Sequence, residues 1–178
     1  EPGEMVVRHS AETPRRGAFS GYLNLPEATE EAWRGGWFHT GDTVRQDETG
    51  MLYFVDRKKN IIRRSGENIA AAEIEACLQP RDDVSAVAVL AVDDPLRDEE
   101  VMACVVPQGA APGPELAEAL FEHCFEGLAY YKAPGWIVFL EDIPVTGTQK
   151  IQKHMIFPAG DDPRARPHAY DLRERKKR

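Results

Sequence analysis

The sequence has few cysteines, no long hydrophobic run and no excess of basic residues. Its three cysteines are widely spaced and include no C-x-x-C pair, which argues against a zinc site and favours reduced, structural thiols in a cytoplasmic protein. The longest apolar run, 84–92, has the length of a β-strand and is far shorter than the roughly 20 residues of a membrane-spanning helix. Acidic residues outnumber basic ones by 30 to 22, which disfavours a general binder of nucleic-acid backbones.

The two commonest sequence signs of a nucleotide cradle, G-x-x-x-x-G-K-[ST] and G-x-G-x-x-G, are also absent. What is present is the composition of a folded globular protein, with 42% hydrophobic and 29% charged residues in a chain of 178. That length has room for one ordinary domain or for two small ones.

Hydrophobic periodicity predicts an α+β fold, in which a small sheet is flanked by helices. Helical spacing and capping signals predict helices over 26–33, 70–78 and 115–125. Runs rich in β-branched residues and bounded by turn residues predict strands over 5–8, 43–45, 51–55, 84–92, 101–106 and 136–140. The strand before Asp56 and the charged run after it place a domain boundary at 56–57, and a charged, loose tail is expected over 160–178.

Three short segments carry residues suited to chemistry: GWFHTGD at 36–42, DRKKNIIRRSGENI at 56–69 and PVTGTQKIQK at 144–153. A carboxylate on a tight Thr-Gly turn, such as Asp42, can accept hydrogen bonds from both hydroxyls of a ribose. Gly66 would let a ligand approach the backbone closely, and Lys150 at a loop tip is a mobile charge suited to phosphate or carboxylate oxygens. Taken singly, the three are equally a turn, a solvated charged face and an exposed lysine.

Their order and spacing resemble the C-terminal part of the adenylate-forming superfamily, which comprises acyl-CoA synthetases, adenylation domains of peptide synthetases and luciferases. The resemblance runs from Gly3 to about Phe157, and the second segment is most similar to the crotonobetaine/carnitine-CoA ligase and fatty acyl-CoA ligase branch. It implies three parts: 1–56 as a β-rich remnant of a large N-terminal domain, 57–159 as the small C-terminal domain with a short, mainly antiparallel sheet flanked by helices, and 160–178 as a charged tail.

The resemblance also implies a role for each matching residue. Nucleotide contacts fall to Thr40, Asp42 and Arg57, the hinge to Asp56, the CoA tunnel to Ser65, Gly66 and Glu67, and catalysis of adenylation to Lys150. No metal ligand is assigned. The sequence departs from the family pattern at Gln149, where a glycine usually precedes the lysine, and this puts the placement of the Lys150 amine in doubt.

The implied activity is a two-step ligase that uses ATP, Mg²⁺ and CoA to convert a carboxylic acid to its CoA thioester. Because the chain starts at Glu1 and lacks the phosphate loop and acyl pocket of the superfamily, we expect it to be a piece of a longer protein. We expect this piece to hold no cofactor and to be inactive without the N-terminal domain. Two alternatives stay open: an adenylation domain that loads a free-standing carrier protein, and a non-catalytic interaction module.

Overall fold

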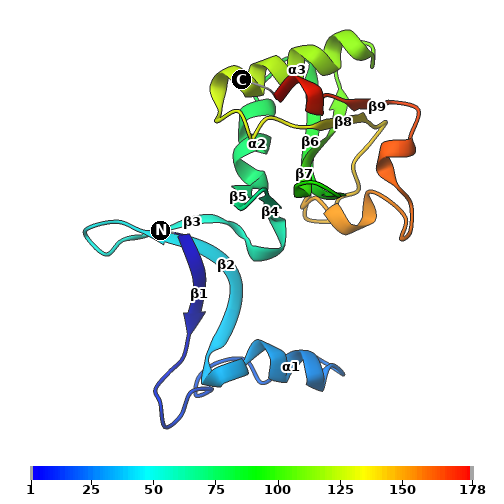
Figure 1. Cartoon of the computed structure of the whole chain (residues 1–178). Helices are drawn as coiled ribbons and strands as arrows, with labels where there is room; N and C mark the ends of the chain where they lie inside the picture. The colour runs from blue at the N-terminus through cyan, green and yellow to red at the C-terminus, as the bar shows by residue number, and fades with distance from the viewer. Residues whose placement is uncertain (1, 177–178) are drawn as a thin grey trace. The chain divides into compact units, whose positions relative to one another are not determined.

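The computed structural model describes residues 2–176, and these divide into two compact units between Lys59 and Asn60 (Figure 1). Each unit is described by itself. The division falls close to the boundary expected at Asp56, whose role as a hinge stays a prediction.

The first unit is built on an antiparallel sheet in the order β1-β2-β3, formed by Pro2–Val7, Phe38–Gln46 and Leu52–Arg57. The helix α1, Pro26–Ala32, begins at a proline as predicted, and the short 3-10 turns η1 (Arg34–Gly36) and η2 (Lys58–Asn60) complete the unit. Asp47 closes the β2–β3 hairpin, because its Oδ1 accepts the backbone N–H groups of Thr49 at 2.9 Å and Met51 at 3.0 Å. The strands predicted over 43–45 and 51–55 are confirmed, and they form this hairpin.

The expectation of a tight turn at Thr40-Gly41-Asp42 is wrong, because these residues lie inside β2. Gly41 has a φ of +73°, and the pairing with β1 shifts register here, since Glu4 pairs with Thr43 and Val6 with His39. Because β1 continues along both sides of the irregularity, the left-handed glycine produces a bulge in the strand, not a reversal of the chain.

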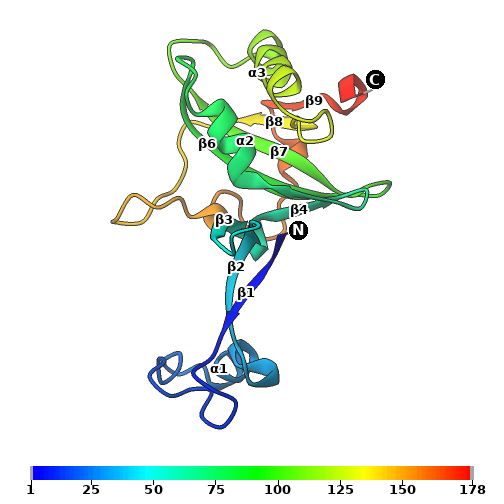
Figure 2. The same ribbon diagram turned by 90° about the vertical axis from the view of Figure 1, so that its left-hand side faces the viewer.

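The second unit holds a larger sheet in the order β5-β4-β7-β8-β9, with β6 paired to β7 (Figures 1 and 2). Its pairs are antiparallel except for β7 with β8. The helices are α2 (Ala71–Leu78) and α3 (Pro114–Gly127), and the 3-10 turns are η3 (Lys153–Met155), η4 (Pro163–Ala165) and η5 (Arg173–Lys176). The strands are β4 (Ile61–Arg64), β5 (Glu67–Ala70), β6 (Val84–Asp94), β7 (Asp98–Pro107), β8 (Trp136–Phe139) and β9 (Ala169–Asp171).

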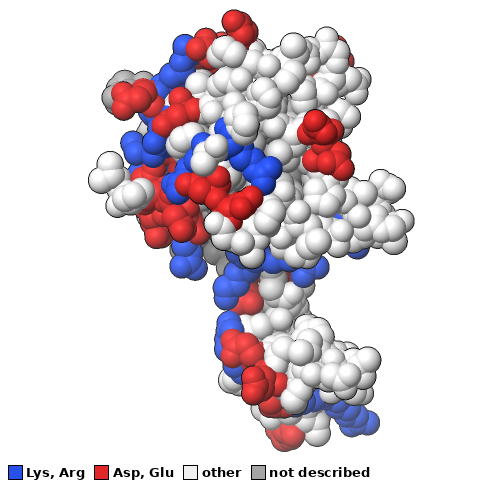
Figure 3. Space-filling model, turned by 90° about the vertical axis from the view of Figure 1, so that its right-hand side faces the viewer, with Lys and Arg blue, Asp and Glu red and all other residues white. Residues whose placement is uncertain are grey.

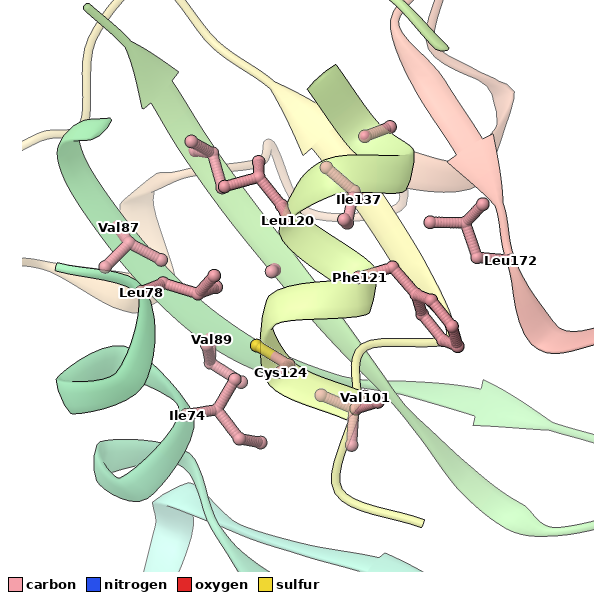
Figure 4. Close-up of a cluster of buried hydrophobic side chains, with 14 of the residues drawn as sticks. Ile74, Leu78, Val87, Val89, Val101, Leu120, Phe121, Cys124, Ile137 and Leu172 are labelled. Carbon is pink, nitrogen blue, oxygen red and sulfur yellow. The ribbon is translucent and has the colours of Figure 1, made fainter. Parts of the chain in front are cut away.

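Side-chain alternation along β6 and β7 gives this sheet two buried faces. One face carries Val87, Val89 and Val101 in the core that includes α2 and α3, and Figure 4 shows Val87 beside Leu78 and Val89 beside Ile74. The opposite face is covered by the segment 140–157. The buried residues of this second cluster, which come from the sheet and from that segment, are Ala88, Met102, Cys104, Val138, Ile143 and Ile156. Helices and strands that the periodicity predicted are therefore confirmed, and the α+β class with them.

The cysteines are reduced, and Cys104 and Cys124 are buried. Burial raises the pKa of the Cys104 thiol to about 12, and burial also raises the pKa of Cys124. These two thiols are poor nucleophiles at neutral pH, which fits the structural role predicted for them.

The expectation of a loose tail is wrong for the residues that the structure describes between 160 and 176. Strand β9 pairs with β8, Leu172 is 7% exposed and Lys176 is 4% exposed. Pairing with the edge of β8 gives this polar segment its order. A strand of three residues has too few side chains to show a periodic pattern, so the sequence alone does not predict it.

Within residues 2–176, no helix is long and apolar enough to cross a lipid bilayer.

Candidate nucleotide and acyl-transfer sites

Strands β2 and β3 bring Asp42 and Arg57 together in the first unit. The two residues are direct partners across the strands, and Arg57 Nη1 lies 2.9 Å from Asp42 Oδ1, an ion pair without the alignment of a hydrogen bond. The guanidinium also donates to the Thr40 carbonyl at 3.2 Å. Asp42 is mostly shielded, with a side chain 21% exposed, whereas that of Arg57 is 54% exposed. The carboxylate therefore sits in place while the arginine can swing toward a ligand.

Thr40 uses its hydroxyl within the bulge. It donates to the Met5 carbonyl at 2.7 Å and accepts the N–H of Asp42 at 3.1 Å. This side chain therefore shapes the backbone around Asp42. Asp56, 4% exposed, accepts the N–H of Arg57 at 2.7 Å and so orients the residue that follows it.

Sequence reasoning missed Glu4 at this site. Its Oε2 lies 2.9 Å from Lys58 Nζ, 3.2 Å from His39 Nδ1 and 3.5 Å from Arg34 Nη2. The hydrogen bond from Lys58 is the main cause that lowers the pKa of Glu4. This carboxylate ties β1 to η1 and η2, and no local sequence signal marks it because its partners lie far along the chain.

Ser65 and Gly66 form the tight turn of the β4–β5 hairpin in the second unit. Both have positive φ, +50° and +86°, as a type I′ turn requires. A Cβ on Gly66 would meet nothing within 4 Å, so the glycine serves the backbone conformation and leaves the turn open. Glu67 is exposed and pairs with Arg64 across the hairpin. An open hairpin of this kind fits the expectation of a ligand-facing backbone.

Lys150 lies in a loop between Val145 and Ile151, which form an isolated bridge. Thr146 organises the loop, since its N–H donates to the Lys150 carbonyl at 2.8 Å and its hydroxyl accepts the Lys150 N–H at 3.1 Å. Gln149 has a φ of +62°, a left-handed conformation that costs a residue with a side chain roughly 1 kcal/mol. Gln149, where the resemblance leads us to expect glycine, thus keeps a glycine-like backbone, and Lys150 is exposed.

A buried charge cluster, formed by Glu100, Arg64 and Lys176, lies next to the Ser65–Gly66 turn. Glu100 is 0% exposed, and its oxygens lie 2.9 Å from Arg64 Nε and 2.5 Å from Lys176 Nζ. A Cβ on Gly135 would come within 2.5 Å of the Glu100 side chain, so only glycine fits there. The cluster links β4, β7 and η5, and it explains how the C-terminal residues are held.

Burial lowers the pKa of Lys176 from its ordinary value of 10.5 to about 8, although Glu100 opposes this shift and Arg64 and Arg97 reinforce it. Its other neighbour is the uncharged Tyr131 carbonyl.

Between pH 8 and pH 10.5, Lys176 is protonated in the unfolded chain and neutral in the folded chain. The stability that this difference gives the folded chain is complete above pH 10.5 and is lost as the pH falls to 8. We therefore expect the free energy of unfolding, relative to that of Lys176→Met, to rise with pH above about 8. Urea unfolding of both proteins at pH 7, 8 and 9 measures this, because contributions from the thiols cancel in the difference. A difference that stays constant over this range would refute the assignment.

The described residues include no group of three His, Cys, Asp or Glu side chains that could hold a metal ion. Mg²⁺ stays an expectation that rests on the resemblance alone.

Comparisons with known proteins find proteins that are similar to most of this chain. Residues 73–150, from α2 through Lys150, match the AMP-binding enzyme C-terminal domain. Over 156 residues it is 39% identical to a crotonobetaine/carnitine–CoA ligase of Proteus mirabilis, a match that covers 86% of the chain and 29% of the relative. The chain therefore spans less than a third of the length of that relative.

Solved structures are similar to most of this chain. The o-succinylbenzoate CoA synthetase of Bacillus subtilis, in complex with its acyl-adenylate intermediate, matches with a TM-score of 0.73 and 30% identity over 89% of this chain and 31% of its own. An amide bond synthetase of Marinactinospora thermotolerans matches with a TM-score of 0.67 and 35% identity over 86% of this chain and 30% of its own. These matches extend well beyond residues 73–150.

Proposed function

We propose that the chain is the C-terminal part of an AMP-forming acyl-CoA ligase of the cytoplasm. Two findings together carry this proposal. Lys150 is exposed on an ordered loop, and a relative of this chain is named as a CoA ligase. The relative and the first solved structure both carry CoA-ligase or CoA-synthetase names, which favours CoA as the acceptor.

The first reaction step joins a carboxylate oxygen to the α-phosphorus of ATP, and the bond to pyrophosphate breaks. Negative charge grows on the phosphoryl oxygens in the transition state, and the ammonium group of Lys150 offsets it. Asp42 accepts hydrogen bonds from the ribose hydroxyls, and Arg57 exchanges its contact with Asp42 for one with the nucleotide.

In the second step, the CoA thiol attacks the acyl carbonyl of the adenylate, the C–O bond to the phosphate breaks and AMP leaves. We assign the open Ser65–Gly66 turn, with Glu67 beside it, to the pantetheine path. Rotation at Asp56 would exchange Lys150 for this turn, so that one small domain serves both steps.

The surface of the first unit supports a missing neighbour. On the edge strand β3, Leu52 and Phe54 lie on the same face of the sheet and are 50% and 62% exposed, an apolar surface that is costly to leave in water. Figure 3 shows acidic and basic side chains next to one another on one face of the larger body. The N-terminal domain of the same enzyme is the partner that we propose for β3.

A specific observation supports a second acceptor. The amide bond synthetase is 35% identical to this chain, so an amine could replace the thiol in the second step. If the chain instead loads a carrier protein, the acceptor is that protein and not CoA or an amine. If the chain is a non-catalytic interaction module, it needs no acceptor.

The longer protein should convert ATP to AMP and pyrophosphate in step with thioester formation, whereas the 178-residue chain should do neither. The reason is that the adenylate would have to form in a pocket that these residues do not build. Carboxylate-dependent exchange of labelled pyrophosphate into ATP, measured for both proteins at equal concentration, tests this. Exchange by the short chain alone would contradict the proposal, and ADP as the nucleotide product of the longer protein would contradict it too.

A further inference from the structure

An ion pair joins helix α2 to the segment that carries Lys150. Lys153 Nζ lies 2.8 Å from Glu75 Oε1, and both side chains are largely shielded, at 19% and 24% exposed. The ammonium nitrogen itself is buried. Helix α2, which follows the second sequence segment, therefore meets the end of the third segment, far along the chain.

Glu75 is held rigidly on its own side. The Val89 N–H donates to Glu75 Oε1 at 2.7 Å, and β6 pairs only with β7 among the described strands. The carboxylate therefore satisfies an amide at the edge of the sheet while it holds the lysine. Two attachments fix this oxygen more firmly than a surface ion pair does.

Lys153 is held at the base of the Lys150 loop, in η3. The Gln152 N–H donates to the Pro144 carbonyl at 2.8 Å, and Val145 bridges Ile151, so the two stems of the loop are fastened just before Lys153. In Figure 2 the loop around residue 150 projects from the body of the second unit. A projecting loop transmits a small shift at its base into a larger one at its tip.

We propose that Glu75 is a positioning residue that acts through Lys153 to aim Lys150 at the reacting phosphate. The role in adenylation rests on the proposed function, whereas the fastening of the loop does not. Loss of the ion pair leaves a shielded ammonium without its counter-charge, and Lys153 is then driven toward water, taking the loop with it.

The variant that isolates this effect is Glu75→Gln. The amide oxygen of glutamine can still accept the Val89 N–H, so the edge of β6 keeps its partner while the charge is lost. The matched control is Glu73→Gln on the same helix, where Lys132 Nζ lies 2.7 Å from a carboxylate that is 41% exposed. The control removes an ion pair of similar length that does not touch the loop.

The first measurement is amide hydrogen exchange in the 178-residue chain. In Glu75→Gln we expect faster exchange at Thr146, Gln149 and Gln152, whose N–H groups close the loop, and unchanged exchange in Glu73→Gln. Unchanged exchange at these three amides in both variants would overturn the proposal.

The second measurement is pyrophosphate exchange in the longer protein. Glu75→Gln should lower kcat on the order of 10-fold with little change in KM for ATP, since a misplaced catalytic group costs rate more than binding. In a Lys150→Ala background the same substitution should add almost nothing, because it acts through that lysine. An additive loss would show a merely structural role and overturn the proposal.

The two measurements separate the proposals. Faster exchange at the loop amides in a protein without adenylation activity supports the fastening of the loop and overturns the proposed function.

Discussion

Replacing Glu100 by glutamine should lower the free energy of unfolding of the second unit by about 3–5 kcal/mol. Glu100 is fully buried between Arg64 and Lys176, and the substitution leaves these two cations facing each other with no counter-charge. Urea unfolding, followed by a probe in the second unit, measures the loss.

The matched control is Glu118→Gln. It breaks the exposed pair of Glu118 with Arg175, which neighbours Lys176 in η5, and should cost about 0–1 kcal/mol. Lys176→Met should also be milder than Glu100→Gln, because Arg64 still pairs with Glu100. If Glu100→Gln is no more destabilising than the control, the buried cluster does not hold the C-terminal segment in place.

Lys150→Ala in the longer protein should reduce carboxylate-dependent pyrophosphate exchange on the order of 100-fold or more, because the charge that develops on the phosphoryl oxygens loses its counter-ion. The folded state should be unaffected, since the side chain is exposed and the loop is organised by Thr146. Initial rates at saturating ATP and carboxylate give the size of the loss.

Lys132→Ala serves as the control for this substitution. Lys132 belongs to the same unit and pairs with Glu73, outside the loop, so its removal should leave the exchange rate within a factor of about two. An equal loss in the two variants would point to a general effect of lysine removal.

The elements that the sequence predicts well are those whose own side chains form the core. Helix α3 and strands β6 and β7 place Leu120, Val89 and Val101 at the spacing of one buried face. Strand β9 escapes prediction because its order comes from pairing with β8, and the bulge at Gly41 escapes it because β1 decides whether that glycine bends or reverses the chain.

The candidate site divides in the same way. Asp42 and Arg57 could be expected to meet because a short hairpin joins their strands, as the structure shows. The contacts of Glu100 could not be expected, since its partners lie 36 and 76 residues away in the sequence. The one available signal was a carboxylate directly before the buried run that starts at Val101, and only tertiary packing shows what neutralises it.

The central claim is that Lys150 serves adenylation and that another face of the domain serves acyl transfer. Supplying preformed acyl-adenylate and CoA to the Lys150→Ala variant of the longer protein tests this most directly. We predict thioester formation within a few fold of the unsubstituted protein, alongside the loss of pyrophosphate exchange. Equal loss of both half-reactions, or retention of both, would contradict the account.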